Sequence, residues 1–331
     1  MRAMVAALDA IAIRLYQAGG PENLRVETLP VPPPGPGEVR LRQTACGLNY
    51  IDVYDRTGLY PAPLPITLGR EAAGVVESVG AGVRGLRAGD RAAYVSASPG
   101  AYASIRNVPA SALVPLPSTL DDERAASLML KGLTAWYLLR RTFPVRKGQE
   151  VVVHAAAGGV GLMLVQWAVA LGAHVVAVVG SADKVALVRA HGAHEVLLQG
   201  GEPLAPRLRE ATRGGAHVVY DGVGRDTFEA SLDSLRPLGM MVTYGNASGP
   251  VPPLAPSELA KRGSLFLTRP SLFHYIARPA ELRRGARETF AAVADGVLSV
   301  HVGQRYPLVD AARAHADLEA RRTLGTTVLL P

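Results

Sequence analysis

The segment HAAAGGVG, residues 154–161, holds the residue types best suited to binding a phosphate group. It follows the β-branched run Val151–Val153 and precedes a predicted helix at Leu162–Leu171. Glycines between a strand and a helix let the backbone turn sharply and approach a pyrophosphate, whose charge is met by free N–H groups and by the positive end of the helix dipole. The segment therefore predicts a dinucleotide site, and the alternative is a glycine cluster that only makes a tight turn.

The end of the next predicted strand indicates which dinucleotide would bind. An NAD site usually places Asp or Glu there, about 20 residues beyond the glycines, whereas this strand ends Val179-Gly180-Ser181. Ser181 can donate a hydrogen bond to a 2'-phosphate, and Lys184 can supply positive charge. Asp183 lies between them, but a helix would point it away from Lys184. The pattern predicts NADPH, and the alternative is that Lys184 is merely solvated.

Other kinds of site find little support in the residues. The single cysteine, Cys46, excludes an internal disulfide framework and every multi-cysteine zinc or iron–sulfur site. His191 and His194 are three residues apart but lack a carboxylate motif, so we interpret them as surface or helix-cap histidines. The chain contains no G-x-S-x-G, H-E-x-x-H or P-loop motif, which disfavours hydrolases and NTPases.

The glycine turn lies in a segment that alternates strands and helices. Residues 151–182 contain no Asp, Glu, Lys or Arg, which is also typical of a transmembrane helix. Glycines, however, divide this segment into strand, turn, helix and strand. We therefore expect no membrane span. The predicted strands are Val151–Val153, Val175–Val179, Glu195–Leu198, His217–Asp221, Gly239–Tyr244 and Ser264–Thr268. Six strands alternating with helices predict an α/β fold with a doubly wound parallel sheet over residues 134–273.

The flanking segments are of another kind. Residues 11–130 are rich in Pro and Gly turns between short strands, which indicates a β-rich domain. The tail ends in a predicted strand, Thr326–Leu330, and we expect it to return to that first domain. The predicted domains are thus 1–133 with 274–331, and 134–273 as an insertion. Residues 1–10 form a short extension ahead of the first strand and do not have the pattern of a signal peptide.

Composition and charge set broader limits. The 331 residues are 48% hydrophobic and 19% charged, which excludes disorder. The formal net charge of +7 would attract anions such as dinucleotide phosphates, nucleic acid or acidic lipid. The arginines are scattered and no basic run carries interleaved aromatic residues, so the sequence disfavours a dedicated nucleic-acid groove.

Six sequence motifs carry a resemblance to a known family. They are CGLNYIDVYDRTGLY (46–60), LGREAAGVVESVG (68–80), AAAGGVG, LKGLTAWYLL, VVYDGVGRDT and LTRPSL. Because of this combination of motifs, the chain resembles the medium-chain dehydrogenase/reductase superfamily. Within that superfamily it resembles the zinc-independent NADPH:quinone oxidoreductases of the zeta-crystallin-like branch. The resemblance implies a Rossmann domain inserted into a GroES-like β-rich catalytic domain, with a cleft between them.

The resemblance also bears on metal binding. Zinc-dependent relatives have a cysteine where this chain has Asn49 and a histidine where it has Arg70. Cys46 lies three positions before the ligand position at residue 49, and Glu71 remains without partner ligands for a zinc ion. We therefore expect no metal. Without a Lewis acid, alcohol oxidation is disfavoured, whereas an electron-poor quinone accepts hydride without one.

The resemblance assigns roles to individual residues. The active-site wall would consist of Asn49, Tyr54 and Tyr60. The cofactor-binding residues would be Thr134, Tyr137, Gly158, Gly159, Val160, Gly180, Ser181, Lys184, Gln199, Tyr244, Gly245, Ser271 and Arg321.

Some of these assignments have structural alternatives. Tyr54 and Tyr60 are also suited to domain packing, and Asn49 to satisfying local backbone groups. Close relatives carry a tyrosine after the third Rossmann strand, where this chain has Gln199. An amide keeps a hydrogen bond but loses stacking, which could relax NADPH selectivity by about 1 kcal/mol.

These observations together predict a cytoplasmic NADPH-dependent quinone reductase that works without metal or flavin. The alternative is an NADPH-dependent alkenal or enoyl double-bond reductase of the same superfamily. A second alternative is an RNA-binding or structural zeta-crystallin-like protein. We also expect a homodimer formed by antiparallel pairing of the edge strand Ser264–Thr268, because an uncovered apolar edge favours association.

Overall fold

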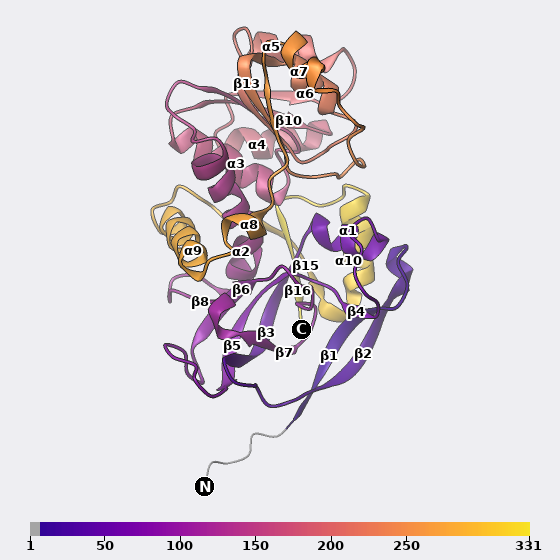
Figure 1. Ribbon diagram of the computed structural model, residues 1–331, viewed down its shortest axis with the longest axis vertical. Helices are drawn as coiled ribbons and strands as arrows, with labels where there is room; N and C mark the ends of the chain where they lie inside the picture. Colours follow the sequence, from indigo (N-terminus) through magenta and orange to yellow (C-terminus); the bar gives the residue numbers. More distant parts are fainter. Residues whose placement is uncertain (1–6) are drawn as a thin grey trace. The chain divides into compact units, whose positions relative to one another are not determined.

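The computed structural model describes residues 7–331, and its chain path is shown in Figure 1. The chain divides into two compact units. The first comprises the chain up to Lys131 together with Ile276–Arg287 and Val300–Pro331, and the second comprises Gly132–Tyr275 and Glu288–Ser299. The domain limits predicted from the sequence stay a prediction, but residues 288–299 pack with the second unit. Of the expected extension at 1–10, residues 1–6 lie outside the described residues, and residues 8–10 already belong to the first strand.

The second unit contains a six-stranded parallel sheet of order β11-β10-β9-β12-β13-β14. Its strands are β9 (Glu150–Val153), β10 (His174–Val179), β11 (Glu195–Leu198), β12 (Ala216–Asp221), β13 (Leu235–Thr243) and β14 (Phe266–Thr268). Numbered from β9, this is the order 3-2-1-4-5-6 of a dinucleotide-binding fold. The predicted doubly wound sheet is confirmed, and the strand order reverses between β9 and β12.

Burial explains the composition of this unit. Val151, Val152 and Val153 are fully buried because the strands of the sheet are covered on both faces, so they need no charged residue. The stretch 151–182 folds as strand, helix and strand, and none of the helices in residues 7–331 is long and apolar enough to cross a membrane.

The helices from residue 122 to 275 are α2 (Asp122–Tyr137), η3 (Leu138–Thr142), α3 (Gly159–Ala170), η4 (Ala182–Lys184), α4 (Val185–Ala190), α5 (Leu204–Ala211), α6 (Phe228–Asp233), α7 (Pro256–Lys261) and α8 (Leu272–Tyr275).

The first unit is β-rich, as predicted. One sheet has three strands, β1 (Leu8–Leu15), β2 (Leu24–Val31) and β4 (Ile66–Thr67). The other sheet consists of β15 (Val302–Pro307), β16 (Thr326–Leu330), β3 (Glu38–Leu48), β5 (Glu71–Val79), β6 (Arg91–Val95) and β8 (Leu113–Pro115), with β7 (Ile105–Pro109) also pairing β3. Because β16 pairs antiparallel with β3, the two C-terminal strands belong to the same sheet as strands from the N-terminal part of the chain.

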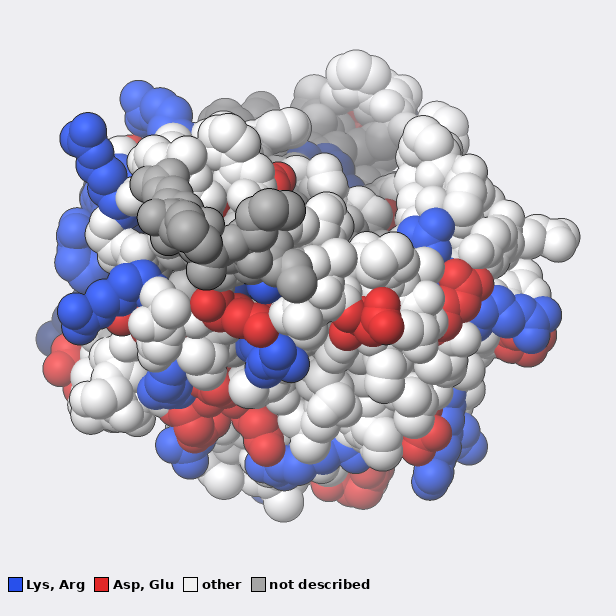
Figure 2. All heavy atoms as spheres, turned by 90° about the horizontal axis from the view of Figure 1, so that it is seen from below, with Lys and Arg blue, Asp and Glu red and all other residues white. Residues whose placement is uncertain are grey.

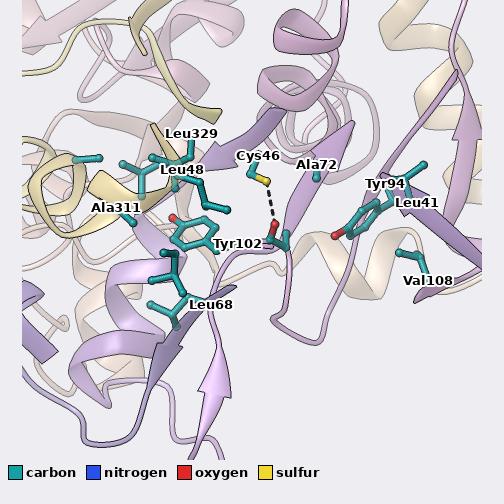
Figure 3. Packing of buried hydrophobic residues seen from close by; sticks show 14 of the residues in the cluster. Leu41, Cys46, Leu48, Leu68, Ala72, Tyr94, Tyr102, Val108, Ala311 and Leu329 are labelled. Atoms are coloured by element: carbon teal, nitrogen blue, oxygen red, sulfur yellow. Dashed lines mark hydrogen bonds between the residues drawn. The ribbon is translucent and has the colours of Figure 1, made fainter. Parts of the chain in front are cut away.

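Helices and short turns complete this unit. They are η1 (Pro21–Asn23), α1 (Tyr50–Thr57), η2 (Ala110–Ala112), α9 (Pro279–Ala294), η5 (Leu308–Asp310) and α10 (Ala311–Glu319), of which α9 continues into the second unit. Figure 3 shows the core, where Leu48, Leu68 and Tyr102 pack together. Cys46 lies in the same core, with Sγ 2.9 Å from the carbonyl oxygen of Ala101. Burial raises the pKa of the Cys46 thiol to about 12, so the thiol stays protonated and packs as an apolar group.

Candidate active site

The glycine turn joins β9 to α3 at the point where the strand order of the sheet reverses. Gly158 takes the N-cap position with extended backbone, and no side chain of the described residues caps α3 there. The first amides of a helix have no partner within it, so they remain available to an anion. A Cβ on Gly161 would clash with the carbonyl oxygen of Ala155 and lie 2.7 Å from Ala156 Cα. Only glycine therefore allows α3 to pack directly on the turn.

The end of β10 places three of the predicted residues on one short segment. Gly180 is exposed, and a Cβ there would meet no atom within 4 Å. Ser181 precedes the 3-10 turn η4, and its carbonyl oxygen accepts a hydrogen bond from the Lys184 amide at 3.3 Å. Ser181 and Lys184 thus lie at the two ends of one turn of backbone at the carboxyl edge of the sheet.

Gln199 lies beside this segment. Its amide donates to the carbonyl oxygen of Val179 at 2.8 Å, which continues the pairing of Leu198 with Val179. Gly200 and Gly201 follow with φ of +99° and +80°, values that favour glycine. The structure therefore brings Gln199 next to Gly180, at the edge where the sequence predicts the 2'-phosphate site.

The predicted pair Tyr244 and Gly245 follows β13 and packs on the loop after β12. A Cβ on Gly222 would lie 2.9 Å from Tyr244 Cζ, and one on Gly245 would clash with the carbonyl oxygen of Gly222. Arg269, which follows β14, donates from Nη1 to the carbonyl oxygens of Thr243 at 2.8 Å and Gly245 at 3.2 Å. Arg269 thus fixes this loop, a role that the motif LTRPSL did not reveal.

A buried hydrogen-bond network beneath the turn also escaped the sequence analysis. Asp221, at the end of β12, accepts bonds from Thr227 Oγ1 at 2.7 Å and Ser231 Oγ at 2.9 Å. It also accepts hydrogen bonds from the backbone amides of Val223 at 2.7 Å and Gly224 at 3.1 Å. Ser231 Oγ lies 3.0 Å from His154 Nε2. Burial lowers the pKa of His154, so its ring is neutral and the network joins the carboxyl ends of β9 and β12.

Three further cofactor predictions fall on α2 and just before α8. Tyr137 is buried, and its ring stacks on that of Tyr275 with centroids 4.4 Å apart. Thr134 is buried on the same helix, and Ser271 is half-buried. Tyr137 is therefore a packing residue in this structure, and its role toward a cofactor stays a prediction.

In the first unit, the structure brings Tyr54 and Tyr60 together. Their ring centroids are 5.2 Å apart at an interplanar angle of 65°, and Tyr50 adds a third ring 6.0 Å from Tyr54. Arg321 follows α10 with φ of +59°, and its charge acts on the Tyr50 hydroxyl, whose pKa is raised mainly by burial. Aromatic rings from α1 and the following loop thus form one cluster.

Asn49 precedes α1 and is engaged by its own unit. Its backbone amide donates to Asp52 Oδ2 at 2.8 Å, and its side-chain Nδ2 donates to Glu71 Oε1 at 2.8 Å and to the carbonyl oxygen of Gly47 at 3.4 Å. Both amide hydrogens therefore have acceptors within the protein. This favours the interpretation that Asn49 satisfies local groups.

Glu71, for which the sequence offers no partner ligand for zinc, is held by other groups of the first unit. It is fully buried, and Lys131 Nζ lies 3.0 Å from its Oε1. The amide of Leu130 donates to Oε2 at 2.6 Å. A Cβ on Gly47 would clash with Glu71, so the glycine makes room for the carboxylate. Sequence analysis missed Lys131 because it lies 60 residues from Glu71.

Arg70 is held by a bidentate ion pair. Its Nε and Nη2 lie 2.8 and 2.7 Å from the carboxylate oxygens of Asp55, and both side chains are buried. The donor set that zinc would need does not fit here, since Arg70 is a cation, Asn49 uses its amide as a donor, and Glu71 is already neutralised by Lys131. Among residues 7–331, no three His, Cys, Asp or Glu side chains are grouped to hold a metal ion.

Asp52 links α1 to the core of the first unit. Tyr102 Oη donates to Asp52 Oδ2 at 3.0 Å and lies 3.2 Å from His315 Nε2. Burial raises the pKa of Asp52 to about 7, with the Asp55 charge adding to the effect. Burial lowers the pKa of His315 to about 3, so this histidine is neutral.

Comparison with known proteins shows which family the chain matches. Residues 35–118 match the alcohol dehydrogenase GroES-like domain, and residues 159–289 match the zinc-binding dehydrogenase family. A quinone oxidoreductase of Pseudomonas aeruginosa is 49% identical over 96% of this chain and 99% of its own length. The crystal structure of Escherichia coli quinone oxidoreductase complexed with NADPH has a TM-score of 0.95 at 45% identity, covering 97% of this chain and 100% of that one.

A relative with a different name is nearly as similar in sequence. The 2-haloacrylate reductase of a Burkholderia species is 45% identical over 97% of this chain and 99% of its own length. The matches thus extend over nearly the whole chain and include both domains. The chain therefore belongs to the zinc-independent quinone oxidoreductase branch of the medium-chain dehydrogenase/reductase superfamily.

Proposed function

We propose that this protein reduces quinones with NADPH and uses neither a metal nor a flavin. The observation that carries the proposal is the uncapped glycine turn at the reversal of strand order, next to a β10 end that has Ser181 and Lys184 in place of a carboxylate. The relatives named quinone oxidoreductase, and the Escherichia coli structure complexed with NADPH, support the same acceptor and cofactor.

The residues of the second unit fit this cofactor. Gly158, Gly159 and Val160 would hold the pyrophosphate through backbone amides, because α3 begins there without a side-chain cap. Ser181 and Lys184 would bind the 2'-phosphate. When bound, NADPH supplies a hydride from its nicotinamide ring. The loop after β13, packed on Gly222 and fixed by Arg269, would support the nicotinamide ribose.

The residues of the first unit would receive the acceptor. Tyr60, half-buried, would offer aromatic surface for a quinone ring, with the ring of the buried Tyr54 packed beside it, and their hydroxyls would orient the quinone oxygen. Asn49 would position the start of α1 rather than contact the acceptor, because its amide hydrogens are directed to Glu71 and Gly47. Reduction of a quinone to a hydroquinone consumes one hydride from NADPH, which carries both electrons, and one proton, which comes from solvent. Catalysis would rest on approximation and exclusion of water.

Steady-state rates with NADPH and 1,4-benzoquinone test the proposal. We expect one NADPH consumed per quinone and unchanged rates in the presence of a chelator. Tyr60→Phe keeps the ring and removes the hydroxyl, so it should lower kcat for quinone while leaving KM for NADPH unchanged. Absence of turnover with every quinone of a panel would refute the proposed reaction.

The 2-haloacrylate reductase relative favours a second candidate function, the reduction of an electron-poor carbon–carbon double bond. Such a bond, like a quinone, accepts hydride at carbon without a Lewis acid. 2-Chloroacrylate and an alkenal belong in the same panel as the quinones. Turnover of these substrates without turnover of any quinone would transfer the assignment to this candidate.

RNA binding, the second alternative, has little support on the face shown in Figure 2, where Lys and Arg are interspersed with Asp and Glu. A phosphate backbone is bound by a continuous run of basic side chains. Retention of AU-rich RNA at ~0.1 M salt, weakened by NADPH, would support this role. Loss of retention under those conditions removes it.

We also propose a homodimer formed through β14. This strand is at the edge of the parallel sheet, and Phe266 and Leu267 on it are 55% and 37% exposed. An exposed apolar edge strand is a template for pairing with a second copy. Light scattering should give twice the chain mass, and Phe266→Lys should give the monomer. A monomeric mass for the unaltered protein at micromolar concentration contradicts the proposal.

A cytoplasmic location is proposed as well, because the reaction consumes NADPH, which cells regenerate there. Cell fractionation tests it, and recovery of the protein outside the cytoplasmic fraction would contradict it.

A further inference from the structure

We infer that Arg207 binds the 2'-phosphate of NADPH together with Lys184 and makes the site selective for NADPH over NADH. The inference rests on the proposed function and deepens it. Arg207 lies on α5, the helix that follows β11, and its side chain reaches back over the loop at the carboxyl end of that strand. Neither the sequence motifs nor the predicted site included it.

Two hydrogen bonds fix where the guanidinium lies. Arg207 Nη1 is 3.1 Å from the carbonyl oxygen of Leu198 and 3.3 Å from that of Gly200. Leu198 pairs with Val179, the last residue of β10, and neighbouring strands lie about 4.8 Å apart. The guanidinium is therefore at the same edge of the sheet as Gly180 and the turn that carries Ser181.

The remaining donors of Arg207 are suited to an anion. Both bonds to the loop use Nη1, which leaves Nε and Nη2 without a hydrogen-bond partner among the described residues. Arg207 forms no ion pair in residues 7–331, although Asp183 and Glu202 are exposed on the adjoining loops. A guanidinium held by one nitrogen presents a pre-oriented fork, and such a fork matches the oxygens of a phosphate.

Gln199 stands at the same edge, directly after Leu198. Gln199 carries no charge and offers no ring for stacking. An arginine anchored one loop away supplies what the amide cannot, a fixed positive charge facing a dianionic group. Selectivity for NADPH in this chain would then depend on two cations, Lys184 and Arg207.

The test compares cofactors in the full-length protein. Arg207→Ala should weaken NADPH binding by about tenfold or more while changing NADH binding less than about twofold. Inhibition by 2',5'-ADP should weaken in parallel, and inhibition by 5'-AMP should not change. Arg207→Lys, which keeps the charge and loses the fork, should fall between Arg207→Ala and the unaltered protein.

Arg209 provides the matched control. It lies two residues along the same helix and also bonds to carbonyl oxygens, those of Leu235 at 2.9 Å and Gly214 at 2.8 Å. Leu235 is the first residue of β13 and Gly214 precedes β12, so Arg209 lies at the opposite, amino-terminal edge of the sheet. Arg209→Ala makes the same change in net charge and should leave the ratio of NADPH to NADH affinity unaltered.

The outcomes separate this inference from the proposed function. If the unaltered protein binds no NADPH, the proposed function fails. If it prefers NADPH and Arg207→Ala keeps that preference, or weakens NADH binding equally, the inference about Arg207 fails and the proposed function stands. A loss of preference in Arg209→Ala equal to that in Arg207→Ala would also overturn the inference, because the effect would then be one of net charge.

Discussion

The buried pair of Glu71 and Lys131 allows a quantitative test of the structure beside Asn49. Lys131 Nζ lies 3.0 Å from Glu71 Oε1, and the two side chains are 7% and 0% exposed. Glu71 also accepts hydrogen bonds from Asn49 and from the amide of Leu130. Removing one member of a buried ion pair leaves the other charge uncompensated, which is more damaging than removing both.

The expected magnitudes follow from this burial. Lys131→Met should lower the free energy of unfolding by about 3–5 kcal/mol, because the carboxylate stays buried without its cation. Glu71→Gln should also destabilise the protein, since it leaves the ammonium unpaired and replaces one accepting oxygen by an NH2 donor that faces the donors of Leu130 or of Asn49 and Lys131. The double variant removes both charges, so its loss should be smaller than the sum of the single losses by about 2 kcal/mol or more.

Urea unfolding followed by circular dichroism measures these losses. Tryptophan fluorescence is unsuitable, because Trp136 and Trp167 both lie in the second unit. Lys261→Met is the matched control, since Lys261 lies 2.7 Å from Glu258 in an exposed pair and its loss should be within the error of the measurement. The reasoning is refuted if Lys131→Met costs no more than Lys261→Met, or if the two single losses add up in the double variant.

Three further outcomes are expected. Burial raises the pKa of Asp52 to about 7, so the folded state binds this proton more tightly than the unfolded chain, and the stability it contributes is full at low pH and lost as pH rises through 7. Asp52→Asn should therefore show a smaller fall in Tm between pH 5 and 8, and an identical fall would contradict the assignment. Gly161→Ala should abolish NADPH binding and lower Tm, because its Cβ would clash with the turn, whereas Gly180→Ala should leave Tm unchanged and any loss of NADPH affinity would report contact with the cofactor. Dialysis against a chelator should leave kcat unchanged, and recovery of activity on adding zinc would contradict the charge balance at Arg70 and Glu71.

The elements of the second unit could be predicted because its signals are local. A strand covered on both faces is a continuous apolar run, as at Val151–Val153, and glycines mark where each strand gives way to a helix. Strand ends were less accurate. The last strand begins at Phe266 rather than Ser264, because Ser264 has φ of +57° and ends a turn instead of extending the sheet. The pairing of β16 with β3 joins residues about 280 positions apart, such as Val328 and Gly47, so no local pattern specifies its register.

The site was predictable where a single segment carries the signal and unpredictable where distant segments meet. The glycine turn and the end of β10 are each readable within about ten residues. The partners of Glu71 come from positions 22 and 60 residues away, and His154 meets Ser231 across 77. The position of Arg207 could not be predicted either. The sequence of α5 does not indicate which of its arginine side chains bonds to the loop after β11.

The charges around α1 oppose the binding of zinc in this chain. Among the buried carboxylates of the first unit, Glu71 and Asp55 are each compensated by a cation. Lys131 and Arg70 provide one each, at 3.0 and 2.7 Å. At the positions where zinc-dependent relatives carry cysteine and histidine, the side chains of Asn49 and Arg70 thus serve to satisfy these carboxylates. A zinc ion added here would meet a guanidinium and a neutralised carboxylate, so electrostatics would oppose its binding. In this chain Lys131 and Arg70 are fixed cations that stabilise the fold, and the site is suited to acceptors that need no polarisation by a metal.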